Sequence, residues 1–485
     1  MKATITLKDE VNCKVEGLDL NTRRKLQNQF SFMLPYAYHV PAFKLGRWDG
    51  KINFFSVGGA TYVNLLEQIL PTLIEAGYEI DLVDKRIDFG TFSFPEITET
   101  HFSNKVWPEK HPIAGEPVVL RDYQVEIINQ FCKNPQCLQE ISTGAGKTLI
   151  TAGLSNIVEE YGRSIVIVPN KDLVIQTEVD YKNLGLDVGV YFGDRKELGK
   201  THTICTWQSL NVIEKNFKDG KTDWSLVDFA EDVVCVIVDE VHQAKGEVLK
   251  KLLTGSFKNI PIRWGLTGTI PKADHDRMTL GISLGELVNQ LSAATLQDAG
   301  VLANCHVNVV QLQETVAYDN YQSELTYLTT DTKRLDYMAD MIADLGKKGN
   351  TLVLIDRIKA GEGLLERLPE DTVFIRGAMK SKDRKQEYDD VSEADNKIIV
   401  ATYGVAAVGI NIPRIFNLVL VEPGKSFVRV IQSIGRGIRK AKDKDSVEIW
   451  DLTSSAKFSK KHLTQRKKFY KEAQYPYTIK KVDYR

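Results

Sequence analysis

The chain has 485 residues, 43% of them hydrophobic and 26% charged, with a formal net charge of −1 at pH 7. This length predicts about three domains. The near-zero charge excludes a globally basic surface, so any nucleic-acid binding must use local basic patches. The apolar runs are far shorter than the ~20 residues that span a bilayer, and the N-terminal segment lacks the apolar core of a signal peptide. The six cysteines form no CxxC pair, which argues against a zinc site. We interpret them as reduced thiols and therefore expect a cytosolic protein, without a membrane partner.

Residues 1–97 are predicted to form a small α+β domain. Asp49-Gly50 is a strong turn signal between two runs that can be strands, and it predicts a hairpin over residues 45–55. The other elements predicted from residue periodicity are a strand at 3–7, helices at 18–32 and 63–76, and a strand at 78–83.

Two cations and an indole lie close to this turn, at Arg47, Trp48 and Lys51. They are compatible with a nucleic-acid contact, with the cations near phosphates and the indole near bases. They are also compatible with a tryptophan that packs under the hairpin beside solvated charges. Composition alone leaves both interpretations open.

Residues 98–117 contain Pro108, Pro112 and Pro117 without any periodicity, and they are predicted to be a linker. Strands and helices then alternate over residues 118–295, which predicts a parallel sheet. Gln124 precedes the glycine-rich stretch described next by about 20 residues. Its amide can read the edge of an adenine, and Tyr123 or Arg121 can pack beside the ring.

The stretch ISTGAGKT, residues 141–148, is predicted to hold a nucleoside triphosphate. Gly144 and Gly146 leave backbone amides free to wrap an anion, Lys147 supplies a positive charge, and the Thr148 hydroxyl can bind Mg²⁺. The alternative is an ordinary glycine-rich turn before the helix predicted at 149–161, but Lys and Thr directly after the second Gly argue against it. The residues predicted to contact the nucleotide here are Ser142, Thr143, Gly144, Ala145, Gly146, Lys147 and Thr148.

The apolar run at 233–238 predicts a central strand buried on both faces, ending in Asp239 and Glu240. Asp239 can hold Mg²⁺ through water, and Glu240 can orient or deprotonate an attacking water. The alternative is an acidic pair that caps a surface strand, which the phosphate loop about 90 residues earlier disfavours. His242 is expected to support this pair. Further strands are predicted at 164–168 and 204–210.

Residues 296–455 repeat the alternation, with strands predicted at 351–355, 372–375, 397–401, 418–421 and 447–450. If residues 432–440 are helical, Gln432, Arg436 and Arg439 lie on one face at i, i+4 and i+7. The two guanidinium groups could then stabilise charge that develops on a γ-phosphate. The alternative is a solvated basic helix face, which two nearby glycines disfavour.

Residues 456–485 carry ten Lys and Arg residues against two acidic ones, with aromatic residues interleaved. This composition suits contact with phosphates. It equally suits a helix packed across the preceding domain with its charges in water.

The order of these motifs, with VPN at 168–170, TWQS at 206–209, DEVH at 239–242 and TGT at 267–269, resembles the superfamily 2 helicases over residues 118–455. The resemblance implies two RecA-like domains that close over ATP and Mg²⁺. It implies a coupling role for His242, Thr267, Gly268, Thr269 and Gly409. It also implies nucleic-acid contact by Asn170, Thr206, Trp207, Gln208 and Thr402. Asn411 stands where many members of the family have Asp, which weakens any carboxylate role at that position.

Three stretches also resemble the UvsW-type branch-migration helicases of phages: GRWDGKI at 46–52, ATYGV at 401–405, and QSIGRGIRK at 432–440 followed by WDL at 450–452. That resemblance implies a monomeric DNA translocase that remodels forks, Holliday junctions, D-loops or R-loops beside recombination or replication proteins. It implies the host cytoplasm if a phage encodes the chain. It also moves Arg47, Trp48 and Lys51 toward DNA contact. An RNA helicase and a translocase or scaffold subunit of a larger complex remain alternatives.

Overall fold

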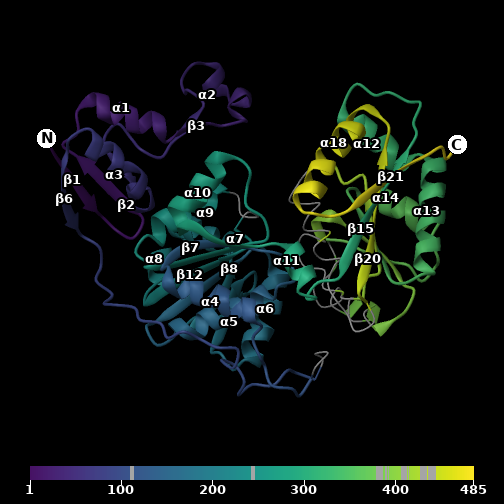
Figure 1. Cartoon of the computed structure of the whole chain (residues 1–485), viewed down its shortest axis with the longest axis horizontal. Helices are drawn as coiled ribbons and strands as arrows, with labels where there is room; N and C mark the ends of the chain where they lie inside the picture. The colour runs from purple at the N-terminus through teal and green to yellow at the C-terminus, as the bar shows by residue number, and fades with distance from the viewer. Residues whose placement is uncertain are drawn as a thin grey trace. The chain divides into compact units, whose positions relative to one another are not determined.

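The computed structural model describes residues 1–109, 114–241, 246–377, 393–405, 414–425 and 444–485, together with residues 379, 386, 387, 390, 391, 412 and 434. The chain divides into two compact units, Met1–Ile141 with Gly146–Gln290, and Ser142–Ala145 with Leu291–Arg485. Each unit is built around a large, mainly parallel sheet with helices against it, which confirms the predicted α/β class (Figure 1). Within the described ranges, no helix is long and apolar enough to cross a membrane.

The N-terminal domain is a small mixed sheet with strand order β5-β2-β1-β6, covered by short helices. Strand β1 pairs antiparallel with β2 and parallel with β6. Its elements are β1 (Lys2–Leu7), β2 (Asn12–Glu16), α1 (Leu20–Gln29), β3 (Ser31–Met33), η1 (Ala37–His39), α2 (Pro41–Lys44), β4 (Lys51–Asn53), β5 (Ala60–Tyr62), η2 (Val63–Leu65), α3 (Leu66–Glu75) and β6 (Glu79–Asp84).

This domain is joined to the first motor domain by a shared core. Ile282 of helix α10 (Asp274–Leu284) is fully buried among the apolar residues of the N-terminal domain. Hydrogen bonds cross the junction as well, among them those from Asn12 Nδ2 to Thr254 O at 3.0 Å and from Gln136 Nε2 to Glu10 O at 3.1 Å. The two domains therefore form one compact unit.

The hairpin predicted over residues 45–55 is wrong. Strand β4 pairs with β3, so its partner precedes it by a long segment, and residues 41–44 form helix α2. Asp49 does form a tight turn, since its carboxylate accepts from Lys51 N at 3.0 Å. The turn leads the chain back from α2 instead of joining two paired strands.

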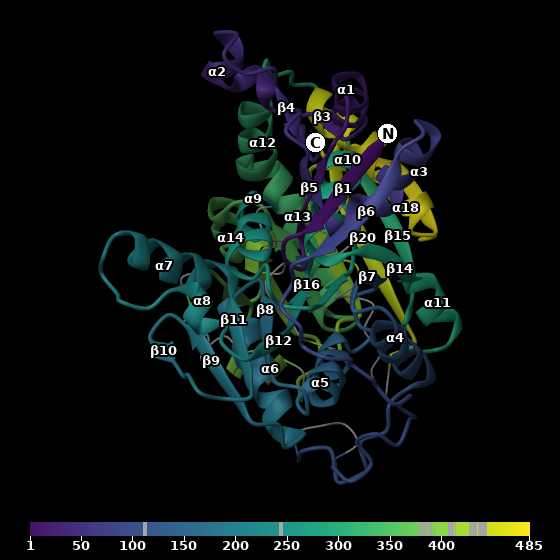
Figure 2. The ribbon, with the colours of Figure 1, turned by 90° about the vertical axis from the view of Figure 1, so that its left-hand side faces the viewer.

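The sheet of the first motor domain has the order β10-β9-β11-β8-β12-β13-β7-β14, and the strands from β9 to β7 run parallel (Figure 2). Its elements are α4 (Asp122–Lys133), β7 (Gln136–Ile141), α5 (Lys147–Val158), β8 (Arg163–Val168), α6 (Lys171–Asn183), β9 (Val188–Phe192), β10 (Arg195–Lys196), β11 (His202–Thr206), α7 (Trp207–Lys218), α8 (Leu226–Phe229), β12 (Val233–Asp239), α9 (Gly246–Lys251), the π-helical turn η4 (Leu252–Ser256), β13 (Ile262–Thr267), α10 and β14 (Glu286–Leu291).

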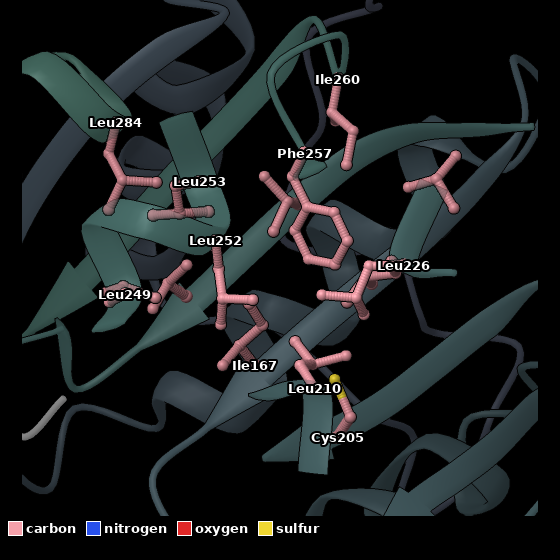
Figure 3. Packing of buried hydrophobic residues seen from close by; sticks show 14 of the residues in the cluster. Ile167, Cys205, Leu210, Leu226, Leu249, Leu252, Leu253, Phe257, Ile260 and Leu284 are labelled. Atoms are coloured by element: carbon pink, nitrogen blue, oxygen red, sulfur yellow. The ribbon is translucent and has the colours of Figure 1, made fainter. Parts of the chain in front are cut away.

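One cluster of the core of this domain lies between the sheet and the helices that cover one of its faces. Ile167 and Cys205 project from strands toward leucines of the covering helices, such as Leu210 and Leu252 (Figure 3). Strand β12 is buried along residues 233–238, as the apolar run predicts. Each fully buried side chain of this kind contributes ~1.5–3 kcal/mol, which fixes the carboxyl ends of the strands in place.

A charged residue is also part of this core. Arg263 on β13 is fully buried, and its guanidinium donates to the carbonyls of Leu253, Phe257 and Ser283 at 2.5 to 2.8 Å. Burial lowers the pKa of Arg263 to about 10. The side chain thus satisfies carbonyls at the ends of two helical segments and ties them to the sheet.

The predicted linker, residues 98–117, is ordered against the first motor domain over its described part. Phe102 is buried. Val106 and Pro117 form an isolated bridge, and Leu120 N donates to Glu99 O at 2.8 Å. The segment therefore packs as part of the first unit.

The second unit contains a seven-stranded parallel sheet with the order β17-β18-β16-β19-β20-β15-β21. The five strands predicted here are present, 351–355 with the predicted ends and the other four with shifted ends. The elements are α11 (Ala293–Asp298), β15 (Asn304–Leu312), α12 (Tyr321–Thr330), α13 (Thr332–Gly346), β16 (Thr351–Ile355), α14 (Ile358–Leu365), β17 (Val373–Ile375), β18 (Ile398–Thr402), β19 (Asn417–Val421), β20 (Ser446–Ser454), α18 (Lys457–Glu472) and β21 (Tyr477–Val482).

The basic C-terminal segment is an integral part of this unit. Helix α18 is followed by the edge strand β21, which pairs with β15. The buried Arg466 of α18 forms an ion pair with the buried Asp451 of β20 at 2.8 Å, and Tyr470 donates to the same carboxylate at 2.7 Å. The segment is therefore packed on the second motor domain, as one of the two alternatives predicted, and its contact with phosphates stays a prediction.

Candidate active site

The predicted motifs of the first motor domain gather at one edge of its sheet. Strands β8, β12, β13 and β7 are parallel neighbours, so their carboxyl ends meet at that edge. The residues that follow these ends include Asn170 after β8, Glu240 after β12, Gly268 after β13 and the phosphate loop after β7. Ligands of parallel sheets bind at this edge.

The phosphate loop has the backbone that an anion cradle requires. Gly144 and Gly146 have φ angles of +93° and +82°, in the left-handed region that favours glycine. Gly146 is the N-cap of α5, so the free amides of the first helical turn follow it directly. A Cβ atom on Gly146 would lie 2.6 Å from Gln124 Nε2, so a side chain there would also displace that amide.

Lys147 and Glu240 form an ion pair beside this loop. Lys147 Nζ lies 2.8 Å from Glu240 Oε1, and both side chains are only about one-tenth exposed, at 10% and 9%. Lys147 Nζ also donates to Ile141 O at 3.2 Å. Glu240 has φ +53°, a conformation that costs a residue other than glycine ~1–3 kcal/mol. This strained backbone places the carboxylate against the lysine.

Glu240 connects the loop to the turn after β13. Its second oxygen accepts from Gly268 N at 3.2 Å. Within the turn, Thr267 Oγ1 donates to Thr269 O at 2.8 Å and accepts from Thr269 N at 3.2 Å. Thr269 Oγ1 is buried, and it has no hydrogen-bond partner among the described residues. The turn therefore keeps one hydroxyl available beside the acidic pair.

Sequence reasoning missed Glu140, the residue before the end of β7. Its carboxylate accepts from Ile270 N at 3.2 Å and from Gln290 Nε2 at 2.7 Å. Glu140 thus holds the segment after Thr269 against the strand that leads into the phosphate loop. Its position one residue before the loop is the only signal that the sequence offers.

Two family models match the chain in these regions. The model described as "Type III restriction enzyme, res subunit" matches residues 117–272, and "Helicase conserved C-terminal domain" matches residues 333–441. Their order agrees with a phosphate loop and an acidic pair in the first domain and a second parallel-sheet domain after it. The chain belongs to the superfamily 2 helicases. Its two motor domains are the ATPase domains of that class.

Curated relatives include other helicases. The chain is 24% identical over 472 residues to the ATP-dependent DNA helicase uvsW of Enterobacteria phage T4, covering 93% of this chain and 90% of that protein. It is 24% identical to the DNA 3'-5' helicase XPB of Kineococcus radiotolerans, covering 77% of this chain and 67% of that protein. A fragment of a putative HsdR subunit of a type I restriction enzyme from Vibrio vulnificus shares the fold, with a TM-score of 0.58 at 17% identity, covering 97% and 85% of the two chains.

The predicted adenine-reading residues of the helicase meet at the start of α4. Gln124 Oε1 accepts from Arg121 N at 3.0 Å, and the Arg121 guanidinium donates to Tyr123 Oη at 2.9 Å. Gln124 is buried. The glutamine therefore braces the helix terminus while its Nε2 faces Gly146, so these residues and the phosphate loop share one location.

The strand predicted at 204–210 is wrong in its second half. Strand β11 ends at Thr206, which caps helix α7 by accepting from Ser209 N at 3.3 Å. Trp207 consequently lies in the first helical turn, and its ring packs against the apolar core. Gln208 Nε2 donates to Pro169 O at 3.3 Å, which links the ends of β11 and β8.

Asn170 has an unused donor at this edge. Its Oδ1 caps α6 by accepting from Leu173 N at 3.0 Å. Its Nδ2 is buried, and no described residue accepts from it. Asn170 therefore retains the polar group that a nucleic-acid contact needs, whereas the Thr206 hydroxyl and the Gln208 amide already have protein partners.

In the second motor domain, Thr402 lies at the carboxyl end of β18, and its Oγ1 accepts from Val405 N at 3.3 Å. Five predicted residues lie outside the described part of the chain. They are His242, Gly409, Gln432, Arg436 and Arg439.

Proposed function

We propose that this helicase is an ATP-driven DNA translocase that remodels branched DNA, such as forks, Holliday junctions, D-loops or R-loops. The observation that carries the proposal is the extent of the match to the phage T4 DNA helicase uvsW, which covers 93% of this chain. The two family models begin only at residue 117. Most of the N-terminal domain therefore lies inside a match that the helicase motor alone does not explain.

ATP fits the loop between β7 and α5. Two left-handed glycines, a helix N-terminus and a largely buried lysine are the groups that hold phosphate oxygens. In the proposed mechanism Lys147 binds the γ-phosphate, and its ion pair with Glu240 breaks. The released Glu240 carboxylate then orients the attacking water and accepts its proton.

Mg²⁺ would be held by the Thr148 hydroxyl and the Asp239 carboxylate, and it would neutralise charge on the phosphates. No three His, Cys, Asp or Glu side chains cluster among the described residues. That donor set suits an ion that takes its other ligands from water and phosphate. From the second motor domain, Gln432, Arg436 and Arg439 are proposed to stabilise the charge that develops on the γ-phosphate.

Helix α18 offers a surface for the phosphate backbone of DNA. Arg466 and Tyr470 fix one face of the helix against β20, which turns the opposite face to solvent. The lysines exposed on that face are Lys457, Lys460, Lys461, Lys468 and Lys471. Their spacing of three and four residues aligns them along one side of the helix, so their charges add at a duplex surface.

The test is an ATPase assay with single-stranded DNA, linear duplex, forked DNA or RNA, paired with a gel assay of fork remodelling. We expect duplex and forked DNA to stimulate hydrolysis and forks to be converted in an ATP-dependent way. Lys147→Ala should abolish both activities, whereas Lys171→Ala, a change at an exposed lysine at the start of α6, should abolish neither. Stimulation by RNA alone would contradict the DNA assignment, and stimulation by duplex without fork conversion would contradict the remodelling.

A further inference from the structure

Residues 31–53 form an arm that stands out from the N-terminal domain. Strands β3 and β4 make its base, and η1 and α2 make its tip, residues 34–50. In both views of the molecule α2 lies at the outer end of the arm, away from the sheets of the first unit (Figures 1 and 2). Leu34 N donates to Gly50 O at 2.9 Å and closes the tip at its base.

The tip has its own small core, so its shape is fixed. Gly50 has φ +78°, and a Cβ atom there would lie 2.8 Å from both Met33 and Phe43. The Phe43 ring meets the rings of Tyr38 and Trp48 edge to face, at centroid distances of 5.2 and 6.5 Å. The Trp48 indole donates to Lys51 O at 3.0 Å. Trp48 is therefore a packing residue of the arm, as one of the two interpretations of the sequence held.

Apolar side chains nevertheless remain exposed on this small arm. Leu45 is 64% exposed, and Tyr38 is 61% exposed, more than any other Tyr, Phe or Trp ring in the described part of the chain. A single exposed apolar residue needs no explanation. With Tyr36, which is 46% exposed, three such side chains lie at the tip of a fixed, projecting arm, where they are placed to meet a flat apolar surface.

The charges of the arm indicate which surface that is. Lys44, Arg47 and Lys51 are exposed, and Asp49 is the only acidic residue of the arm. Cations beside an exposed ring suit a nucleic acid at a point where bases are unpaired or a helix ends, because the ring stacks on a base and the cations meet neighbouring phosphates.

We propose that the arm is a wedge for strand junctions, in which Tyr38 and Leu45 cover the bases at the point where two strands separate. Lys44, Arg47 and Lys51 hold the adjoining phosphates. The fixed shape of the tip lowers the entropy cost of this contact. The inference rests on the proposed DNA-remodelling function and adds to it the part of the chain that contacts the strand junction. The arm does not take part in ATP hydrolysis.

The test compares Tyr38→Ala and Leu45→Ala with two matched controls. Tyr38→Phe keeps the ring, and Ile74→Ala removes an equally exposed apolar side chain on α3 of the same domain. Because stacking on an aromatic ring contributes ~1–3 kcal/mol per base, Tyr38→Ala should weaken binding to forked DNA about 5- to 150-fold. Tyr38→Phe and Ile74→Ala should bind as the unchanged chain does. ATPase activity on linear duplex should be unaffected in all four variants.

A second measurement reports the stacking itself. A fork with 2-aminopurine at the junction should change its fluorescence when the unchanged chain binds, and this change should be lost with Tyr38→Ala and kept with Tyr38→Phe. If forks are remodelled normally by Tyr38→Ala, the wedge is refuted while the DNA-remodelling function stands. If no DNA stimulates the ATPase of the unchanged chain, the proposed function itself fails. If Tyr38→Ala lost binding to a protein partner while its binding to forked DNA stayed intact, the wedge would also be refuted.

Discussion

Replacing Glu240 by Gln should strengthen nucleotide binding while it abolishes hydrolysis. Lys147 Nζ is 2.8 Å from the Glu240 carboxylate, so a phosphate must compete with that carboxylate for the lysine. A glutamine keeps the shape of the side chain and can still accept from Gly268 N, but it loses the charge. The competition for Lys147 therefore weakens.

The magnitude follows from the burial of the pair. Both side chains are about one-tenth exposed, at 10% and 9%, so solvent screens their interaction little. A hydrogen bond to a charged group contributes ~1.5–3 kcal/mol, and removing the charge of the acceptor while Lys147 keeps its own weakens the bond by roughly half. The difference of about 1–1.5 kcal/mol corresponds to a roughly 5- to 15-fold lower Kd for a non-hydrolysable ATP analogue.

Isothermal titration calorimetry without DNA measures this difference directly. The matched control is Glu140→Gln, which makes the same chemical change on strand β7 of the same sheet, where the carboxylate binds Ile270 N and Gln290 instead of Lys147. The control should leave the Kd within about twofold of its original value, since it leaves Lys147 untouched. If Glu240→Gln binds the analogue no more tightly than the unchanged chain, the competition between carboxylate and phosphate for Lys147 is refuted.

Three further predictions concern stability and DNA binding. Arg263→Met should lower the free energy of unfolding by about 2–4 kcal/mol in denaturant titration, because it leaves buried carbonyls of the helical segments without a donor; an effect below about 1 kcal/mol would contradict this role. Burial lowers the pKa of His202 from its usual 6.5, so the unfolded chain binds more protons, and stability should be lost as the pH falls below about 6.5. His202→Gln should reduce the difference in unfolding free energy between pH 7.5 and 5.5, unlike a change at the exposed His39. Replacing Lys460, Lys461 and Lys468 by Ala should reduce the slope of log K against log salt for duplex DNA by about 2–3, and an unchanged slope would remove α18 from the DNA contact.

The sequence was most informative where one local rule decides the structure. The continuous apolar run of β12 predicts a strand that is buried on both faces, and the structure has that strand. Residues 351–355 likewise form strand β16 as predicted. The phosphate loop was equally readable, since its two glycines adopt the left-handed backbone that other residues avoid. These features of the sequence alone predict that Lys147 and Glu240 lie at one edge of the sheet.

Features that depend on distant partners were not readable. Strand β4 selects β3 as its partner, and nothing local to Asp49-Gly50 reveals that choice. The charges of the C-terminal segment also concealed its structure, because composition cannot distinguish the buried Arg466 from the exposed lysines around it. Trp207 was misplaced because Thr206 can end a strand and cap a helix with the same hydroxyl.

The shared core between the N-terminal domain and α10 has a mechanical consequence. Ile282 is buried among residues of that domain, and backbone groups near residues 10 and 254 bind across the junction. The arm at residues 31–53 therefore belongs to the same compact unit as Lys147 and Glu240. If ATP displaces the first motor domain, we therefore expect the arm and Tyr38 to move with that domain.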